Sequence, residues 1–394
     1  MARKSLFHLA TEEEILKGKV TDVYFLRAMQ ILKSKRIHRR VKAEFVVKKF
    51  PHDWPWGVFA GLEAAAHLLK TLKLSARSVP EGAIFRVGEP VLVIEGDYLD
   101  MCVYETALLG LLCQASGIAT KAAHCRKLVG DRRLFSFGSR RIHPALAPMV
   151  ERSAYLGGCD GVSSVKGASS LGIDPVGTMP HALILLLGGS KEAILAFHQS
   201  INRKVKRVCL VDTIGDEKFE ALGAAEALGK NLSAVRLDTP SSRRGNFVEI
   251  LKEVRWELDL RGFRHVELFV SGGIDEGDIP LLNPWVSGYG VGTAISSSAV
   301  LDFAMDIVEI EGNPMAKRGK LSGEKELLRC GRCFSSKIFP KKGASLPERC
   351  PCGGRYEKLL KPLLSEGKLK TPLPSIEAIR RYVLMQLPKY PLEH

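Results

Sequence analysis

Between about residues 130 and 295 the chain repeats one pattern, in which a short apolar run ends in a small or polar residue and a helix-length segment follows. Strands that alternate with helices in this way form parallel sheets covered by helices. The number of repeats predicts a compact, irregular α/β barrel over 119–295, with its chemistry at the carboxyl ends of the strands. The predicted strands are RLFSFGSR (133–140), GGCDGVSS (157–164), DPVGTMPH (174–181), RVCLVDT (207–213), SAVRLDT (233–239), VELFVSGG (266–273) and GYGVGT (288–293).

The residues before this region follow a different pattern. EEEILKGKVTDVYFLRAMQILKSK has helical periodicity, whereas KAEFVVKKF and AIFRVGEPVLVIEGDY alternate as antiparallel strands do. A long amphipathic helix, ETALLGLLCQASGIATKAAHCRKLV, is predicted to lead into the barrel. We therefore expect an N-terminal α+β domain over 1–118, rejoined by 296–325, and a separate C-terminal domain over 326–394.

The composition describes a globular protein with an anionic partner. Of its 394 residues 45% are hydrophobic and 26% charged, and the net charge is +15. Nucleic acid, phosphorylated metabolites and acidic membranes all carry the opposite charge, so charge alone does not choose among them. Continuous apolar runs fall short of the roughly 18 residues of a membrane span, and the N-terminus lacks a signal-like apolar stretch. We expect a cytoplasmic protein that does not bind membranes, and scarce Gln and Asn beside abundant Lys, Arg and Glu are typical of thermophiles.

The nine cysteines fall into two groups. Five are scattered among apolar neighbours and are expected to be small core residues in a reducing compartment. The other four form the pattern C-x2-C-x16-C-x-C, which predicts a structural zinc (or iron) site in a zinc-ribbon-like segment. Because all four positions are cysteine, the ion would have no open position for catalysis. The metal ligands are Cys330, Cys333, Cys350 and Cys352.

Two glycine-rich loops follow late strands of the predicted barrel, VSGGID (270–275) and GVGTAISSS (290–298). Backbone amides without bulky side chains, and a helix N-terminus after the second loop, suit an anion. Glycine loops of this kind on neighbouring late strands are a recurrent phosphate site in barrels. The alternative is a pair of tight turns that simply require glycine.

Aromatic and charged side chains follow other strands. Phe137 lies at the end of FSFGSRR, with Arg140 and Arg141 behind it, which suits a flat anionic ring that stacks on the phenyl group. Arg236 and Asp238 lie on one side of the strand RLDT, where the aspartate could hold ribose hydroxyls or Mg²⁺, or form an internal ion pair with the arginine.

Three further side chains complete the predicted site. Asp212 in CLVDT and Asp160 in GGCDG are predicted at strand ends. Together with Asp238, the arginines and the glycine loops, these carboxylates predict a pocket for a phosphorylated sugar and a metal. His181 in GTMPH follows Thr178 at another predicted strand end, among the reactive groups.

These segments together resemble the nicotinate phosphoribosyltransferases, specifically the shorter archaeal-type members of the type II phosphoribosyltransferases. The resemblance extends over nearly the whole chain and includes a cysteine-bearing C-terminal extension. It is carried by TDVYFLR, YETALLGLLCQASGIATKA, FSFGSRRIHPALAPMVERSAYLGGCDGVSS, DPVGTMPHAL, RLDTPSSRRGNF, VSGGID and GVGTAISSS.

The resemblance implies that nicotinate attacks C1 of 5-phosphoribosyl 1-pyrophosphate (PRPP), giving nicotinate mononucleotide and pyrophosphate for NAD synthesis, with Mg²⁺ accompanying PRPP. Tyr24 would reach from a neighbouring subunit, in at least a dimer, and stack on the pyridine opposite Phe137. Arg140 and Thr178 would border the ring and its carboxylate, and Asp160 is a further candidate for contact with the base.

The resemblance also implies the phosphoribosyl contacts. Arg236 and Asp238 would contact the sugar phosphate as catalytic residues together with Asp212. ATP as co-substrate would phosphorylate His181, although GTMPH replaces the GT-x-A-H often found in the family. The 5-phosphate would be held by Gly272, Gly273, Gly292 and Thr293.

Rival interpretations remain open at the level of sequence. Quinolinate would need more cationic groups than Arg140 and Arg141 provide, and nicotinamide would prefer an acidic contact such as Asp160. A nucleic-acid-binding zinc-ribbon protein is an alternative from a different class, since Arg329, Lys341 and neighbouring basic residues surround the cysteines.

Overall fold

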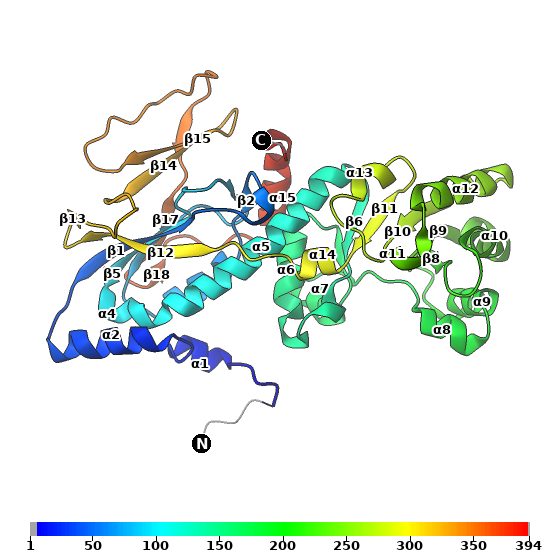
Figure 1. The fold of residues 1–394 in the computed structure, drawn as a ribbon, viewed down its shortest axis with the longest axis horizontal. Helices are drawn as coiled ribbons and strands as arrows, with labels where there is room; N and C mark the ends of the chain where they lie inside the picture. The colour runs from blue at the N-terminus through cyan, green and yellow to red at the C-terminus, as the bar shows by residue number, and fades with distance from the viewer. Residues whose placement is uncertain (1–5, 393–394) are drawn as a thin grey trace. The chain divides into compact units, whose positions relative to one another are not determined.

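The computed structural model describes residues 6–392, and the chain divides into two compact units. One unit consists of Met1–Thr120 together with Ala299–His394, and the other of Lys121–Ser298. Figure 1 labels many of the helices and strands of both. The residues expected to form a separate C-terminal domain, 326–394, fall within the first unit.

The first unit is built on an antiparallel sheet of seven strands in the order β13-β12-β1-β5-β3-β17-β18. The predicted strand KAEFVVKKF is confirmed in β1, and AVLDFAMDIVEI forms β12. A two-stranded sheet pairs β2 with β4, so VGEP connects strands of different sheets. The strands are β1 (Arg40–Val47), β2 (Gly57–Val58), β3 (Ser75–Ser78), β4 (Ile84–Phe85), β5 (Leu92–Asp97), β12 (Phe303–Ile310), β13 (Asn313–Pro314), β17 (Lys361–Ser365) and β18 (Lys368–Leu369).

The predicted long helix is confirmed as α5 (Glu105–Val129). Together with the short helical turns before it, α5 forms the stretch Tyr98–Val129, which by length and composition could cross a membrane. The search for continuous apolar runs in the sequence did not indicate this stretch. Its Leu108 and Leu112 belong to the hydrophobic core of the sheet, so the apolar face is accounted for by packing. The other helices here are α1 (Glu12–Leu16), α2 (Val23–Ser34), η1 (Pro51–Asp53), α3 (Leu62–Leu69), α4 (Tyr98–Met101), η2 (Cys102–Tyr104), α15 (Ile376–Gln386) and η6 (Leu387–Lys389).

The cysteine-bearing segment forms a three-stranded sheet, β15-β14-β16, from β14 (Lys325–Cys330), β15 (Ser336–Pro340) and β16 (Tyr356–Lys358). Charged side chains of β14 are buried against the rest of the unit. Lys325 Nζ lies 2.7 Å from Glu44 Oε1, and Arg329 Nη2 lies 3.4 Å from Glu89 Oε2. After β16 the chain returns to the large sheet as β17, paired with β3. These long-range contacts explain why the segment belongs to the first unit.

The second unit contains six parallel strands in the order β7-β6-β11-β10-β9-β8. The parallel strands are as predicted, and the expected irregular barrel is present as a curled half-barrel, whose edge strands β7 and β8 do not pair with each other. The strands are β6 (Arg133–Ser136), β7 (Gly161–Val162), β8 (Arg207–Leu210), β9 (Leu232–Leu237), β10 (Glu267–Val270) and β11 (Gly288–Val291).

The strand predicted at 174–181 does not form. Residues 174–180 lack regular structure, and a helix begins at His181. Pro175 and Pro180 explain this, because proline cannot donate to a sheet ladder. Without this seventh strand the sheet has no partner to close it.

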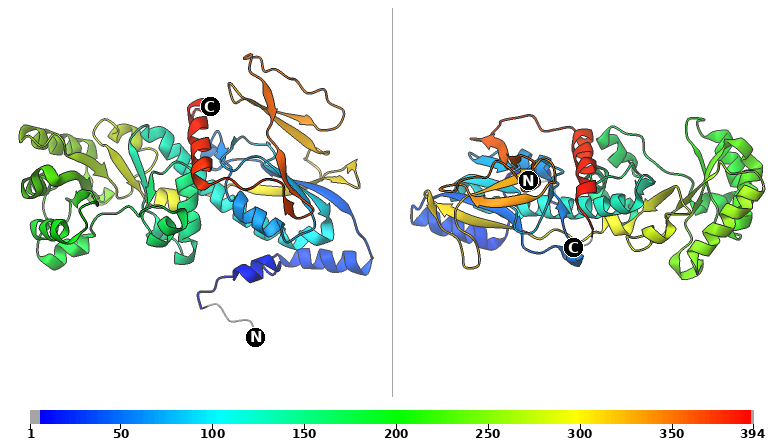
Figure 2. Two further views of the ribbon diagram at one scale, coloured as in Figure 1. Left: turned by 180° about the vertical axis from the view of Figure 1, so that it is seen from behind. Right: turned by 90° about the horizontal axis from the view of Figure 1, so that it is seen from above.

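Helices surround the half-barrel sheet, and α9, α10 and α12 pack side by side near β8 and β9 (Figures 1 and 2). The helices of this unit are η3 (Ser139–Arg141), η4 (Pro144–Leu146), α6 (Ala147–Leu156), α7 (Val165–Leu171), α8 (His181–Leu187), α9 (Ser190–Ser200), α10 (Glu217–Leu228), η5 (Gly229–Asn231), α11 (Ser241–Arg244), α12 (Phe247–Leu260), α13 (Ile279–Leu282) and α14 (Thr293–Ser296).

Candidate functional site

The predicted rim of reactive groups exists at the carboxyl edge of the six-stranded sheet. Because the strands are parallel, the residues that follow them meet at one edge. Phe137 follows β6, Asp238 follows β9, and Gly272 and Gly273 lie two and three residues after the end of β10. Gly292 follows β11 directly. The sheet order places these exits on neighbouring strands.

Arg236 and Asp238 form the charged centre of this edge. Arg236 Nη1 lies 3.8 Å from Asp238 Oδ1, and Ser271 bridges them. The Ser271 hydroxyl accepts from Arg236 Nη1 at 3.3 Å and donates to Asp238 Oδ1 at 2.5 Å. Burial lowers the pKa of Arg236, and the carboxylates of Asp238 and Asp212 oppose that shift.

Ser271 was not among the predicted site residues. It lies in VSGGID directly after β10, and its side chain is buried. The sequence signal was its position in a loop already singled out for its glycines. Its partners could not be identified without the register of β9 against β10, which sets Val270 beside Leu237.

Asp212 joins the cluster from β8. Its Oδ2 accepts from the backbone N–H of Asp238 at 3.2 Å, and its Oδ1 lies 3.3 Å from Nε2 of His181. Only 2% of its side chain is exposed, against 41% for His181. Burial raises the pKa of Asp212 to about 6, a shift opposed by His181 and reinforced by the nearby Asp238. The site thus holds two carboxylates in distinct environments.

Two glycines permit close approach at this edge. Gly272 has a φ of +82°, and a Cβ on it would lie 2.5 Å from the carbonyl oxygen of Asp238. A Cβ on Gly290, in β11, would lie 2.3 Å from the Phe137 ring. Both positions therefore require glycine, because an added methyl group would displace groups of the cluster.

Phe137 follows β6 and lies at the same carboxyl edge of the sheet. Its backbone N–H donates to Val291 O at 2.9 Å, and the guanidinium of Arg236 lies 5.9 Å from the centre of its ring. A further ring, Phe135, stacks on it at 6.2 Å between centroids. An aromatic face beside a guanidinium is suited to a flat anionic ligand.

The second glycine loop differs from the prediction in one respect. The helix that follows Gly292 is α14, a single turn of four residues, Thr293–Ser296. Helix-dipole effects need longer aligned peptide units, so this turn adds little field of its own. Any anion binding here would depend on the individual amides of the glycine loops.

Three further predicted residues, Thr178, Arg140 and Tyr24, lie outside the cluster of Arg236, Asp238 and Asp212. Thr178 lies in the loop before α8, next to Met179, whose carbonyl lies 3.5 Å from Arg236 Nη2. Arg140 is exposed in η3, three residues after Phe137. Tyr24 is exposed on α2 of the first unit, so its role in a partner subunit stays a prediction.

Asp160 does not belong to this edge. It precedes β7 instead of ending it, and its Oδ2 accepts from the backbone N–H of Leu134 at 2.9 Å and from Arg126 Nη2 at 3.1 Å. Leu134 lies at the amino end of β6, and Arg126 lies near the end of α5, just before that strand. Asp160 was expected at the end of a strand, but it lies just before β7, and its contact with the base stays a prediction.

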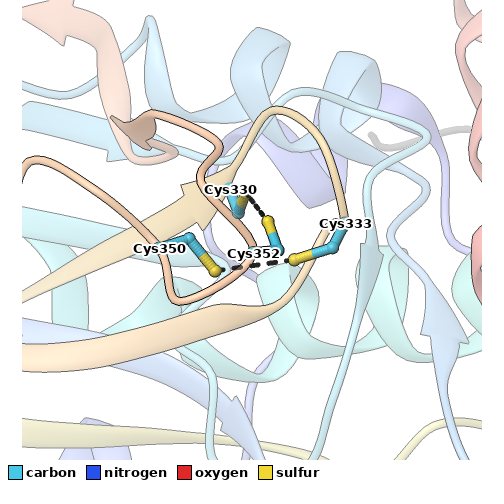
Figure 3. Close-up of side chains that lie close together, drawn as sticks. All are labelled: Cys330, Cys333, Cys350 and Cys352. Atoms are coloured by element: carbon cyan, nitrogen blue, oxygen red, sulfur yellow. Dashed lines mark hydrogen bonds between the residues drawn. The ribbon is translucent and has the colours of Figure 1, made fainter.

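The four clustered cysteines converge as predicted (Figure 3). Sγ of Cys330 lies 3.5 Å from Sγ of Cys352, Sγ of Cys333 lies 3.6 Å from Sγ of Cys350, and all four atoms lie within 4.8 Å of one another. Tetrahedral zinc with bonds of about 2.3 Å requires sulfurs roughly 3.8 Å apart. The Ser335 hydroxyl helps to lower the pKa of Cys350 to about 5. The donor set therefore fits zinc.

Among the basic residues near the cysteines, Arg329 is buried within the protein, whereas Arg332, Lys337, Lys341 and Lys342 are exposed. Arg329 is 4% exposed and pairs with Glu89, and Lys341 Nζ lies 2.8 Å from Glu324 Oε1. A nucleic-acid interface needs cations that face solvent. Arg329 cannot serve such an interface, and the ribbon alternative rests on the exposed cations Arg332, Lys337 and Lys342.

Comparisons with known proteins agree with this geometry. The family models "Quinolinate phosphoribosyl transferase, N-terminal domain" and "C-terminal domain" match residues 22–116 and 118–306. A solved structure from Pyrococcus furiosus, described as a nicotinate-nucleotide pyrophosphorylase, is 51% identical, covers 99% of this chain and 100% of its own, and superposes with a TM-score of 0.96.

Curated relatives extend the comparison. The nicotinate phosphoribosyltransferase of Mycobacterium tuberculosis is 31% identical over 64% of this chain, and the chain spans only 58% of that protein's length. The human nicotinic acid phosphoribosyltransferase structure, 21% identical with a TM-score of 0.75 over 94% of both chains, shows a shared fold. With two matching domain models and a solved relative similar over its full length, this chain belongs to the type II phosphoribosyltransferase family.

Proposed function

We propose that this protein is a nicotinate phosphoribosyltransferase, which makes nicotinate mononucleotide and pyrophosphate from nicotinate and PRPP in NAD biosynthesis. The observation that carries the proposal is the cluster of Arg236, Ser271, Asp238 and Gly272 beside the Phe137 ring. Its cation, carboxylate, close-packed glycine and aromatic face match a sugar phosphate joined to a flat ring. Curated relatives named nicotinate phosphoribosyltransferase support the choice of base.

Each part of the substrates has a partner in this proposal. The pyridine ring stacks on Phe137, and its carboxylate faces Arg140 and Thr178. The ribose phosphate contacts Arg236 and the amides around Gly272, with Gly273, Gly292 and Thr293 completing the phosphate cradle. Glycines at Gly272 and Gly273, with φ of +82° and +78°, leave the backbone open to an anion.

Catalysis in this proposal rests on position and charge. The pyridine nitrogen is unprotonated at neutral pH, so the attack needs no general base. Departure of pyrophosphate leaves positive charge at C1, which a fixed carboxylate stabilises if it is already in place. Asp238 is suited to this role because Ser271 and Arg236 hold its Oδ1. Mg²⁺ that arrives with PRPP would neutralise part of the pyrophosphate charge.

ATP coupling through His181 is part of the proposal. The Nε2 atom of His181 faces Asp212, and a carboxylate at this distance favours a proton on that nitrogen. The lone pair then lies on Nδ1, the nucleophile that phosphorylation requires. The 41% exposure of the imidazole leaves room for ATP to approach.

Two structural features complete the proposal. Tyr24, exposed on α2, is expected to stack on the base in a partner subunit, so the active form is at least a dimer. Zinc on the four cysteines would hold the turns between β14 and β16, and it would stabilise the fold without taking part in the reaction.

Quinolinate is the second candidate, because the matching domain models are named for quinolinate phosphoribosyl transferase. It carries two carboxylates, and Arg236 pairs with Asp238 and is assigned to the ribose phosphate, so Arg140 and Arg141 are the cations left for the base, which favours the base with one carboxylate. The test is to supply nicotinate, quinolinate and nicotinamide separately with PRPP and Mg²⁺, with and without ATP, and to measure mononucleotide formation. Turnover of quinolinate alone would reject the nicotinate assignment, and equal rates with and without ATP would reject the coupling.

A further inference from the structure

The first turn of α10 contacts the loop that follows β8. The Glu220 carboxylate accepts three consecutive backbone N–H groups: Oε1 accepts from Ile214 at 2.9 Å and from Gly215 at 2.6 Å, and Oε2 accepts from Thr213 at 3.4 Å. This loop begins one residue after Asp212. Amides that converge on an ionised carboxylate make charge-assisted hydrogen bonds, which are stronger than neutral ones.

The same turn contacts the loop that follows β9. Glu217 Oε1 accepts from the Thr239 hydroxyl at 2.7 Å, and Thr239 is 6% exposed and follows Asp238 directly. The backbone N–H of Asp238 in turn donates to Asp212 Oδ2 at 3.2 Å. The hydrogen bonds therefore form a closed network that connects α10, the residues after β8 and the residues after β9.

Ordinary helix capping does not explain the two glutamates. Asp216 caps α10, since its side chain accepts from the backbone N–H of Lys218 at 3.0 Å. The carboxylate oxygens of Glu217 and Glu220 accept hydrogen bonds from residues outside the helix. The helix itself is well anchored, because Ala221 and Ala225 are fully buried.

We infer that α10 is a brace for the reaction site, with Glu220 and Glu217 as positioning residues that fix Asp212 and Asp238. The expected effect on turnover rests on the proposed function. That the glutamates fix the loops after β8 and β9 rests on the hydrogen bonds alone. A displacement of about 1 Å at a reacting centre can cost about 100-fold in rate, so the brace would act on turnover without touching substrate.

The experiment compares Glu220→Ala and Glu220→Gln with the wild-type protein. We expect Glu220→Ala to lower kcat/KM for PRPP about 10- to 100-fold, with a fall in kcat as well as a rise in KM. Glu220→Gln keeps an oxygen that accepts N–H groups, so it should recover most of the activity. Thr239→Val removes only the hydroxyl at the other exit and should cost less.

The matched control is Glu253→Ala. It removes a contact to the same helix, the 2.7 Å ion pair with Lys218, but touches neither exit loop, so kcat/KM should stay at the wild-type value. Glu220→Ala should lower kcat/KM much less in the Asp212→Asn background than in the wild-type protein, because the glutamate acts through the aspartate. Full additivity would overturn the inference.

Amide hydrogen exchange separates the inference from the proposed function. Exchange at 213–215 should accelerate in Glu220→Ala and stay slow in Glu253→Ala, whatever the substrate is. Unchanged exchange would overturn the brace, as would wild-type kcat/KM in Glu220→Ala. If the wild type turns over none of the bases, the proposed function fails, and accelerated exchange would still support the brace.

Discussion

Replacing Ser271 with alanine should lower kcat/KM for PRPP by about 10- to 150-fold while the protein stays folded. The hydroxyl donates to Asp238 Oδ1 at 2.5 Å and accepts from Arg236 Nη1 at 3.3 Å, and the residue is 2% exposed. A hydrogen bond to a charged group contributes about 1.5–3 kcal/mol, and every 1.4 kcal/mol is a factor of ten. Loss of the bond to Asp238 alone gives the predicted range.

The direction of the effect follows from the same distances. Arg236 Nη1 and Asp238 Oδ1 lie 3.8 Å apart, and without the serine between them they can close into a direct ion pair. A carboxylate neutralised by arginine stabilises positive charge at C1 less well. We therefore expect the loss mainly in kcat.

The assay is the initial rate of nicotinate mononucleotide formation at saturating nicotinate and varied PRPP, together with a thermal melt. Ser116→Ala is the matched control. This serine is also fully buried and also makes two hydrogen bonds, to Ala60 N at 3.0 Å and Ala60 O at 3.1 Å, but it belongs to the first unit. It should lower Tm and leave kcat/KM unchanged. Wild-type kcat/KM in folded Ser271→Ala, or an equal loss in both variants, would refute the reasoning.

Four further predictions address other parts of the molecule. Asp238→Ala should collapse kcat in a folded protein, and normal kcat would remove its assigned role. Phe137→Ala should raise KM for the base with little change in Tm, since it removes a stacking face worth about 0.5–1.5 kcal/mol; an unchanged KM would contradict this. Replacing Cys330 and Cys350 with serine should release bound zinc and lower Tm without lowering turnover of the protein that remains folded, and retained zinc would argue against the site. Burial raises the pKa of Glu105 from 4.5 to about 7, so the folded protein keeps a proton that the unfolded chain releases. Stability from this group is complete below pH 4.5 and falls as the pH rises to 7, so Glu105→Gln should stabilise the protein at pH 8, by at most about 3 kcal/mol, and not at pH 4; equal gains at both pH values would refute the shift.

The sequence by itself determined the local features of this protein. Apolar runs that end in Phe137, Asp238 and Gly272 predicted strands followed by polar exits, and the structure places those exits on neighbouring strands. The spacing of the cysteines predicted their convergence, which the pairing of β14 with β16 completes. In each case the signal lies within a few residues of the group that it places.

The tertiary structure decided what depends on partners distant in sequence. Ser271 bridges Arg236 and Asp238 only because β10 pairs with β9 in one register, and a shift of one residue would turn the serine to the other face. Asp160 was misplaced because a two-residue strand starts after it, and a strand that short has no periodicity of its own. The chain at 174–180 forms no strand, although the Val176 N–H donates to Val162 O of β7 at 2.8 Å, and the sheet is not closed there because closure depends on the pairing of whole strands. Pairing of this kind is a property of the folded chain, since it joins residues far apart in sequence, such as Glu267 with Ala234 and Gly288 with Arg133.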